Sequence, residues 1–174
     1  LRDQLRRDWP EQAEAIFAAS VLPADTWLRV NRRRGTRDAY LERLDAAGME
    51  AVADAGLSDA LRLPASIAVA ALPGFADGDV SVQDGAAQAV ADALAPPPGA
   101  RVLDACAAPG GKSAHLLERD PTLRLLALDV EPSRLARVRD TWRRLQVGEG
   151  VDPGAAARVA DAADPAAWWD GDPF

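Results

Sequence analysis

The second half of the chain alternates short apolar runs with segments in which apolar residues recur at helical spacing. Apolar runs at 101–104, 123–128 and 157–160 predict strands, and the segments 113–118 and 132–145 predict helices between them. Strands that alternate with helices at this spacing are typical of βαβ units around a parallel sheet. The pattern therefore predicts an α/β, Rossmann-like domain in this half.

The first half has a different pattern. Apolar positions at helical spacing predict a helix over 3–20 that ends at Pro23, and alternation over 27–31 predicts a strand with Trp27 or Leu28 inward. Thr36 is placed to cap a helix through Leu44 that Gly48 closes. Short strands are expected at 60–63, 67–69 and 80–84, followed by an alanine-rich helix to residue 94. We expect a small α+β module over 1–72 and the Rossmann-like domain over 73–174, with the boundary near 72–80.

Composition narrows the class of protein. With 48% hydrophobic and 27% charged residues among 174, the chain can bury a core. Its apolar stretches fall short of the roughly 18 residues needed to cross a bilayer, and no signal-peptide core precedes them. We expect a cytoplasmic protein with no membrane partner. The single cysteine excludes an internal disulfide and a cysteine-based zinc site, and we expect no metal.

The charge is unevenly distributed. The net charge of -7 disfavours a nucleic-acid partner, because phosphate repels a negative protein. However, five arginines fall within residues 29–37 and five more within the predicted helix 132–145. Such runs are either solvated faces or phosphate contacts, and the charge pattern by itself leaves both open.

The most distinctive motif is the string Asp104–Ser113 (DACAAPGGKS), which lies between the first predicted strand of the sheet and its helix. An open parallel sheet places ligands there. Glycines let the backbone approach a ligand, and the helix N-terminus offers free N–H groups to an anion. Asp129 ends the second strand, where an acid commonly accepts hydrogen bonds from ribose hydroxyls. Asp161 follows the third strand at the same edge and can either hydrogen-bond an adenine amino group or help close the pocket.

Two other nucleotide motifs do not fit this string. A phosphate-binding P-loop needs glycine at position 106, which is cysteine, so a nucleoside triphosphate is disfavoured. The spacing of Gly110 and Gly111 also differs from the dinucleotide fingerprint. An ordinary tight turn between strand and helix is the structural alternative to a cofactor loop.

The string 103–112, together with Val82-Gln83-Asp84, Leu128-Asp129-Val130, Trp27–Asn31 and Leu72–Phe75, resembles RNA (cytosine-5) methyltransferases, in particular the RsmB (Sun) type that acts on 16S ribosomal RNA. The resemblance implies a partial Rossmann-like domain that binds S-adenosyl-L-methionine, preceded by an RNA-binding module. It implies that Asp129 binds the ribose and that Asp161 lies by the adenine. The residues implied to hold the methionine end are Cys106, Ala107, Ala108, Pro109, Gly110, Gly111 and Lys112. Arg29, Arg32, Arg33 and Arg34 become candidates for contacts with ribosomal RNA.

The chain departs from that family in one respect. Family members use two cysteines, in Pro-Cys and Thr-Cys-Ser motifs after later strands, and neither motif occurs before Phe174. We expect a fragment of a longer enzyme that is inactive by itself, with no catalytic residue in this chain.

Cys106 is expected to be a small buried residue under the loop, and His115 a partly exposed helix residue. Trp168 and Trp169 are expected to pack a short helix on the sheet or to stay partly exposed.

Two other functions compete with this interpretation. The first is a noncatalytic RNA-binding or interaction protein with a vestigial cofactor fold. The second is methyl transfer to a protein or small molecule, which the resemblance of the first module disfavours.

Overall fold

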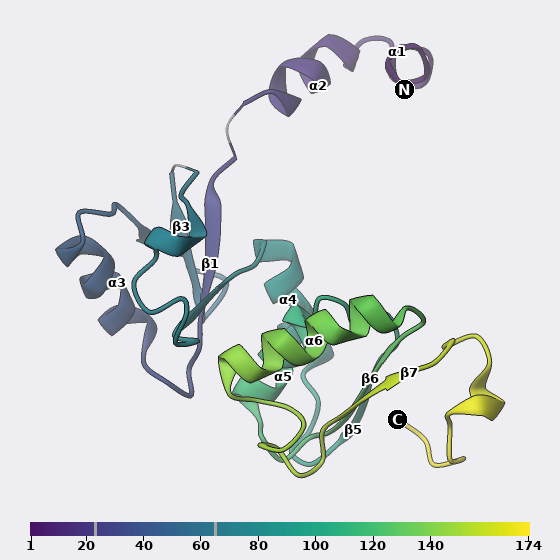
Figure 1. Ribbon diagram of the computed structural model, residues 1–174. Coiled ribbons are helices and arrows are strands. Elements are labelled where there is room, and N and C mark those ends of the chain that lie inside the picture. Colours follow the sequence, from purple (N-terminus) through teal and green to yellow (C-terminus); the bar gives the residue numbers. More distant parts are fainter. Residues whose placement is uncertain (23, 65) are drawn as a thin grey trace.

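The computed structural model describes residues 1–22, 24–64 and 66–174, which form two sheets and an N-terminal pair of helices (Figure 1). The helices are α1 (Arg2–Asp8), α2 (Ala13–Ser20), α3 (Arg37–Ala46), α4 (Gly85–Leu94), α5 (Gly111–Arg119) and α6 (Pro132–Leu145). The strands are β1 (Thr26–Val30), β2 (Val52–Ala53), β3 (Ala60–Leu63), β4 (Val80–Val82), β5 (Arg101–Asp104), β6 (Arg124–Asp129) and β7 (Ala156–Val159). Short 3-10 turns, η1 (Val69–Ala71) and η2 (Pro165–Ala167), complete the set.

The first module is an antiparallel sheet with strand order β2-β3-β1-β4, covered by α3 on one face. Leu28 opposes Leu61 across β1 and β3, and both side chains are buried against Tyr40 and Leu44 of α3. The Thr36 hydroxyl caps α3 by accepting from the Ala39 N–H, as predicted. The opposite face of β1 is also buried, because the second module covers it.

The second module contains the predicted parallel sheet, with order β5-β6-β7, and its α/β class is confirmed. Helix α6 has the predicted bounds, and proline at its first turn suits a helix start because that N–H has no partner inside the helix. Its apolar stripe of Leu135, Val138 and Trp142 is buried against Leu125 and Ala127 of β6.

The N-terminal prediction of one helix over 3–20 is wrong. The chain forms α1 and α2, which project away from both modules in Figure 1. They are separated at Trp9-Pro10, where proline lacks an N–H and disfavours the helical conformation of the preceding residue. Only Ala13 is buried within the two helices, so no tertiary packing opposes the break. Pro23, the predicted end of the helix, lies outside the described residues.

One other prediction needs correction. Residues 67–69 do not form a strand: β3 already has β2 and β1 as neighbours, and the chain instead makes the turn η1. Strand β4, which follows the expected boundary near 72–80, pairs with β1 in the first sheet. Among the described helices, none is long and apolar enough to cross a membrane.

Candidate functional site

The loop from β5 to α5 carries the predicted cofactor motif. Ala107 is buried, and its N–H donates to the Leu128 carbonyl of β6 over 2.9 Å. The loop contains a cis peptide bond between Ala108 and Pro109. Gly110 has φ +94°, and a Cβ there would lie 3.1 Å from the Cα of Val138 in α6, so the turn requires glycine. Helix α5 then begins without a side-chain cap from Gly110, and within its first turn the Ser113 N–H donates to the Asp104 carboxyl.

Asp129 lies beside this loop at the carboxyl end of β6. Its Oδ2 accepts from the Ala108 N–H over 3.3 Å, and its Oδ1 accepts from the Glu131 N–H over 3.2 Å. The half-exposed Arg134 guanidinium lies 3.4 Å from the same carboxylate, which is 2% exposed. The predicted neighbours, loop and acid, are thus directly hydrogen-bonded.

Two other acids mark the same sheet edge. Asp104 ends β5, and burial raises the pKa of its carboxyl. Hydrogen bonds from Ser113 and the Cys106 main chain act to lower this pKa but do not outweigh the burial. Asp161 comes just after β7, where the Ala160 N–H donates to the Asp129 carbonyl over 3.2 Å. The Asp161 carboxylate is exposed and accepts from the Ala163 N–H. Carboxyl ends of parallel strands therefore place these acids along one edge, as the spacing predicted.

The prediction that Cys106 is buried is wrong. Its side chain is exposed, with the sulfur 3.8 Å from Nη2 of Arg134. Ala107 fills the core position instead, because the chain turns toward β6 one residue later than expected.

The candidate RNA-binding arginines all have carboxylate partners within the chain. Arg29 is fully buried and ion-paired with Glu118, so it cannot contact RNA in this structure. Arg32 pairs with Asp59, Arg33 with Asp152 and Arg34 with Asp79, at 2.7, 2.9 and 2.7 Å. Their side chains remain 43%, 28% and 32% exposed, so phosphate can still reach these three.

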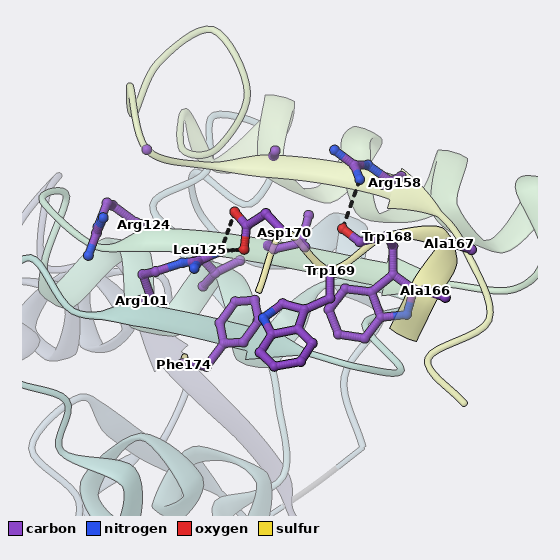
Figure 2. A pocket seen from close by; sticks show the side chains of 13 residues that line it. Arg101, Arg124, Leu125, Arg158, Ala166, Ala167, Trp168, Trp169, Asp170 and Phe174 are labelled. Carbon is purple, nitrogen blue, oxygen red and sulfur yellow. Dashed lines mark hydrogen bonds and ion pairs between the residues drawn. The ribbon is translucent and has the colours of Figure 1, made fainter. Parts of the chain in front are cut away.

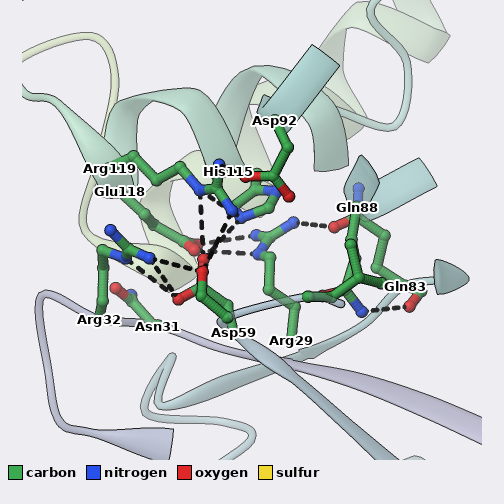
Figure 3. Close-up of polar contacts among 12 residues, drawn as sticks. Arg29, Asn31, Arg32, Asp59, Gln83, Gln88, Asp92, His115, Glu118 and Arg119 are labelled. Atoms are coloured by element: carbon green, nitrogen blue, oxygen red, sulfur yellow. Dashed lines mark hydrogen bonds and ion pairs between the residues drawn. The ribbon is translucent and has the colours of Figure 1, made fainter. Parts of the chain in front are cut away.

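His115 also differs from its prediction, since it is 2% exposed at the contact between the two modules (Figure 3). Its Nε2 lies 3.0 Å from Oδ2 of Asp59, and its Nδ1 is buried without a hydrogen-bond partner among the described residues. Burial acts to raise the pKa of Asp59, but hydrogen bonds from His115 and Arg32 outweigh it and hold that pKa well below its ordinary value. Burial lowers the pKa of His115, and the nearby charges of Arg29 and Arg119 lower it further. The hydrogen bond to Asp59 acts to raise this pKa but does not outweigh them.

This lowered pKa predicts a pH dependence of stability. As pH falls below about 6.5, an unfolded chain binds a proton that native His115 does not, so stability is lost from there down toward the native pKa. We expect urea unfolding to show a slope approaching about 1.4 kcal/mol per pH unit below neutrality. Because the sequence has one histidine, His115→Gln should remove this slope above pH 5. An equal slope in the variant would contradict the assignment.

The contact between modules is the part of the site that the sequence did not predict. It joins Arg29 of β1 to Glu118 of α5, and Asp59, just before β3, to His115 of α5. These segments are far apart in the chain. A signal was present, because Gly111, His115 and Glu118 recur at helical spacing on one face of α5. Polar residues on that face are equally typical of a solvated surface.

A separate cavity of about 450 Å³ lies between the strands β5 to β7 and the C-terminal segment that carries Trp168, Trp169 and Phe174 (Figure 2). Arg101 at the start of β5 pairs with Asp170 at 2.9 Å and lies 4.6 Å from the Phe174 ring centre. Trp168 is half-buried and Trp169 is 45% exposed, which agrees with the expectation of partial exposure. This cavity has none of the three acids of the sheet edge in its lining.

Comparison with known families covers both modules. Residues 1–70 match an RsmF/B-like methyltransferase ferredoxin-like domain, and residues 91–169 match the 16S rRNA methyltransferase RsmB/F domain. The chain belongs to the RsmB/F methyltransferase family. The resemblance carried by the glycine loop and its aspartate is thereby confirmed at the level of family.

Curated RsmB/F relatives align along the whole chain. Ribosomal RNA small subunit methyltransferase B of Xylella fastidiosa is 58% identical over 174 residues, and that of Xanthomonas campestris is 59% identical. In both cases the alignment covers 100% of this chain and 39% of the relative, so the chain spans about two fifths of their length.

Solved structures share the fold of this chain. A methyltransferase homolog from Pyrococcus horikoshii superposes with a TM-score of 0.75 at 25% identity, covering 91% of this chain and 51% of that one. NSun6 from the same organism gives a TM-score of 0.78 at 16% identity, covering 92% and 65%, which shows a shared fold.

Proposed function

We propose that this chain holds the cofactor site of an S-adenosyl-L-methionine-dependent enzyme that methylates C5 of a cytosine in 16S ribosomal RNA. The observation that carries the proposal is the start of α5, which has no side-chain cap from Gly110 and lies after the Gly110 turn beside Asp129, in a chain matched by a 16S rRNA methyltransferase domain. Since the chain spans 39% of its relatives, the reaction is proposed for the protein of their length.

The residues at this edge suit each part of the cofactor. The first N–H groups of α5 favour a carboxylate such as that of the methionine end. Asp104 and Asp129 supply negative charge for the sulfonium and ammonium groups and acceptors for ribose hydroxyls. Asp161 is exposed and available to an adenine amino group. When bound, the cofactor supplies the transferable methyl group, while the chain binds and orients it.

Binding of S-adenosyl-L-methionine by calorimetric titration tests this assignment. Asp129→Ala removes the carboxylate that orders the loop and accepts from ribose, and we expect affinity to fall at least about tenfold. Asp140→Ala is the control, because Asp140 is exposed on α6 and, among the described residues, its ion-pair partner is Arg143. No binding by the unmodified chain, or equal affinity of both variants, would contradict the cofactor site.

Catalysis of cytosine methylation requires a cysteine thiolate that attacks C6 and makes C5 nucleophilic. By resemblance to the family, that thiolate belongs to Pro-Cys and Thr-Cys-Ser motifs, which do not occur in these 174 residues, and Cys106 lies in the candidate cofactor loop. We therefore expect the purified 174-residue chain to transfer no methyl group to 16S ribosomal RNA. The measurement is incorporation of labelled methyl into cytosine, and incorporation above a no-protein control would overturn this expectation.

Ribosomal RNA would meet the first module at Arg32, Arg33 and Arg34. Their guanidinium groups are partly exposed on the turn after β1, and Lys and Arg groups account for most of the affinity for phosphate backbones. Binding of RNA with no binding of S-adenosyl-L-methionine would favour the alternative, a noncatalytic RNA-binding protein with a vestigial cofactor fold.

A further inference from the structure

One face of α5 is turned toward the first module rather than toward its own sheet. This face carries Gly111, His115 and Glu118, spaced at about one and two helical turns. Figure 3 shows His115 and Glu118 meeting Asp59 and Arg29 at the contact between the modules. Helix α5, which follows the candidate cofactor loop, is thus held by side chains of the first module.

Arg29 makes the central contact. Its side chain is fully buried on β1, and its Nε and Nη2 donate to the two carboxylate oxygens of Glu118 over 2.9 and 2.8 Å. The remaining nitrogen, Nη1, donates to the Gly111 carbonyl over 2.7 Å and to Oε1 of Gln83. One planar guanidinium therefore binds the first residue of α5 and a residue two turns further along.

The bond to Gly111 bears directly on the cofactor loop. The Gly111 carbonyl and the Lys112 N–H belong to one rigid trans peptide unit and point in opposite directions. Fixing the carbonyl on Arg29 therefore fixes the direction of the Lys112 N–H, which lies in the first turn of the helix. Because the guanidinium is a rigid fork, its pairing with Glu118 also sets the rotation of α5 about its axis.

We propose that Arg29 is a positioning residue for the cofactor site, which holds the first turn of α5 in the orientation that binds S-adenosyl-L-methionine. This inference rests on the proposed function of that site. It makes the first module a structural part of the cofactor site, although Arg29 itself is fully buried. The arginine that the sequence assigned to RNA thus orients a helix that borders the cofactor site.

The test is Arg29→Lys in the 174-residue chain, read by calorimetric titration with S-adenosyl-L-methionine. Lysine keeps the charge opposite Glu118, but a single ammonium cannot reproduce the fork that reaches both Glu118 and Gly111. We expect affinity to fall about tenfold, as for loss of a hydrogen bond from a charged group. Hydrogen exchange of residues 110–114 in the absence of ligand should rise in the same variant.

Arg33→Lys is the matched control. Arg33 also joins the two modules, through two contacts of 2.9 and 3.2 Å to Asp152, but it touches neither α5 nor the loop. We expect its affinity for the cofactor and its exchange at residues 110–114 to match the unmodified chain. Equal losses in Arg33→Lys and Arg29→Lys would show that module docking in general matters, and would overturn the positioning role.

A second variant covers the case in which Arg29→Lys does not fold. Gln83→Ala removes one acceptor of Nη1 and leaves the pair with Glu118 intact, so it should weaken binding and raise exchange at residues 110–114 to a smaller degree. Folded variants with unchanged affinity and unchanged exchange would refute the inference. If the unmodified chain binds no cofactor, the proposed function fails, while the exchange data still decide whether Arg29 holds this turn.

Discussion

Glu118→Ala is expected to lower the free energy of unfolding by about 3 to 5 kcal/mol, because it leaves the Arg29 charge buried without a partner. Both side chains are at most 1% exposed, so water cannot replace the lost carboxylate. Among the described residues, Arg29 would then keep the Gly111 carbonyl and Gln83 as its acceptors. Urea unfolding followed by tryptophan fluorescence measures the loss.

Two controls make this prediction specific. Glu14→Ala breaks an exposed pair with Arg6, with side chains 76% and 51% exposed, and should leave the unfolding midpoint almost unchanged. The double variant Arg29→Met with Glu118→Leu removes both charges together and should recover most of the stability. A loss below about 1 kcal/mol for Glu118→Ala would mean that water reaches the pair after all.

Gly78→Ala is expected to lower the free energy of unfolding by about 2 to 5 kcal/mol, the sum of backbone strain and overpacking. Gly78 has φ +86°, and a Cβ there would lie 2.2 Å from the Arg144 carbonyl oxygen of α6. That oxygen is main chain in a packed helix, so it cannot move aside without displacing α6 from the first module.

Gly99→Ala separates the two contributions. Gly99 has φ +72°, but no atom lies within 4 Å of the place that an alanine Cβ would take, so alanine there costs only the left-handed backbone, about 1 to 2 kcal/mol. The difference in the free energy of unfolding between the two variants, measured by urea unfolding, is the steric cost of placing the Gly78 methyl group against the Arg144 carbonyl. Equal losses would show that α6 accommodates the extra methyl group.

The second module could be predicted from sequence because its signals are local. Apolar runs and helical spacing define β5 through β7, and Pro132 marks the start of α6. The candidate cofactor edge could be predicted for the same reason, since a parallel sheet brings the ends of β5 and β6 to one edge. Asp129 and the glycine loop lie together because of that topology.

The roles of Arg29, His115 and Cys106 could not be predicted in this way. Whether a polar side chain is exposed depends on what packs against it, and the partners of Arg29 lie 54 to 89 residues away in sequence. The charge of Arg29 and its place in an arginine-rich run both favoured a solvated or RNA-binding role. Similarly, the burial of His115 depends on Asp59 of the first module.

The sequence by itself determined the α/β class, the position of the cofactor loop and the acid beside it, because periodicity and strand order are encoded in neighbouring residues. Only the tertiary structure decided which arginines stay partly exposed and which one is buried against α5. The physical reason is that burying a charge is costly without a partner, and the partner, Glu118, is supplied by a module that lies later in the chain.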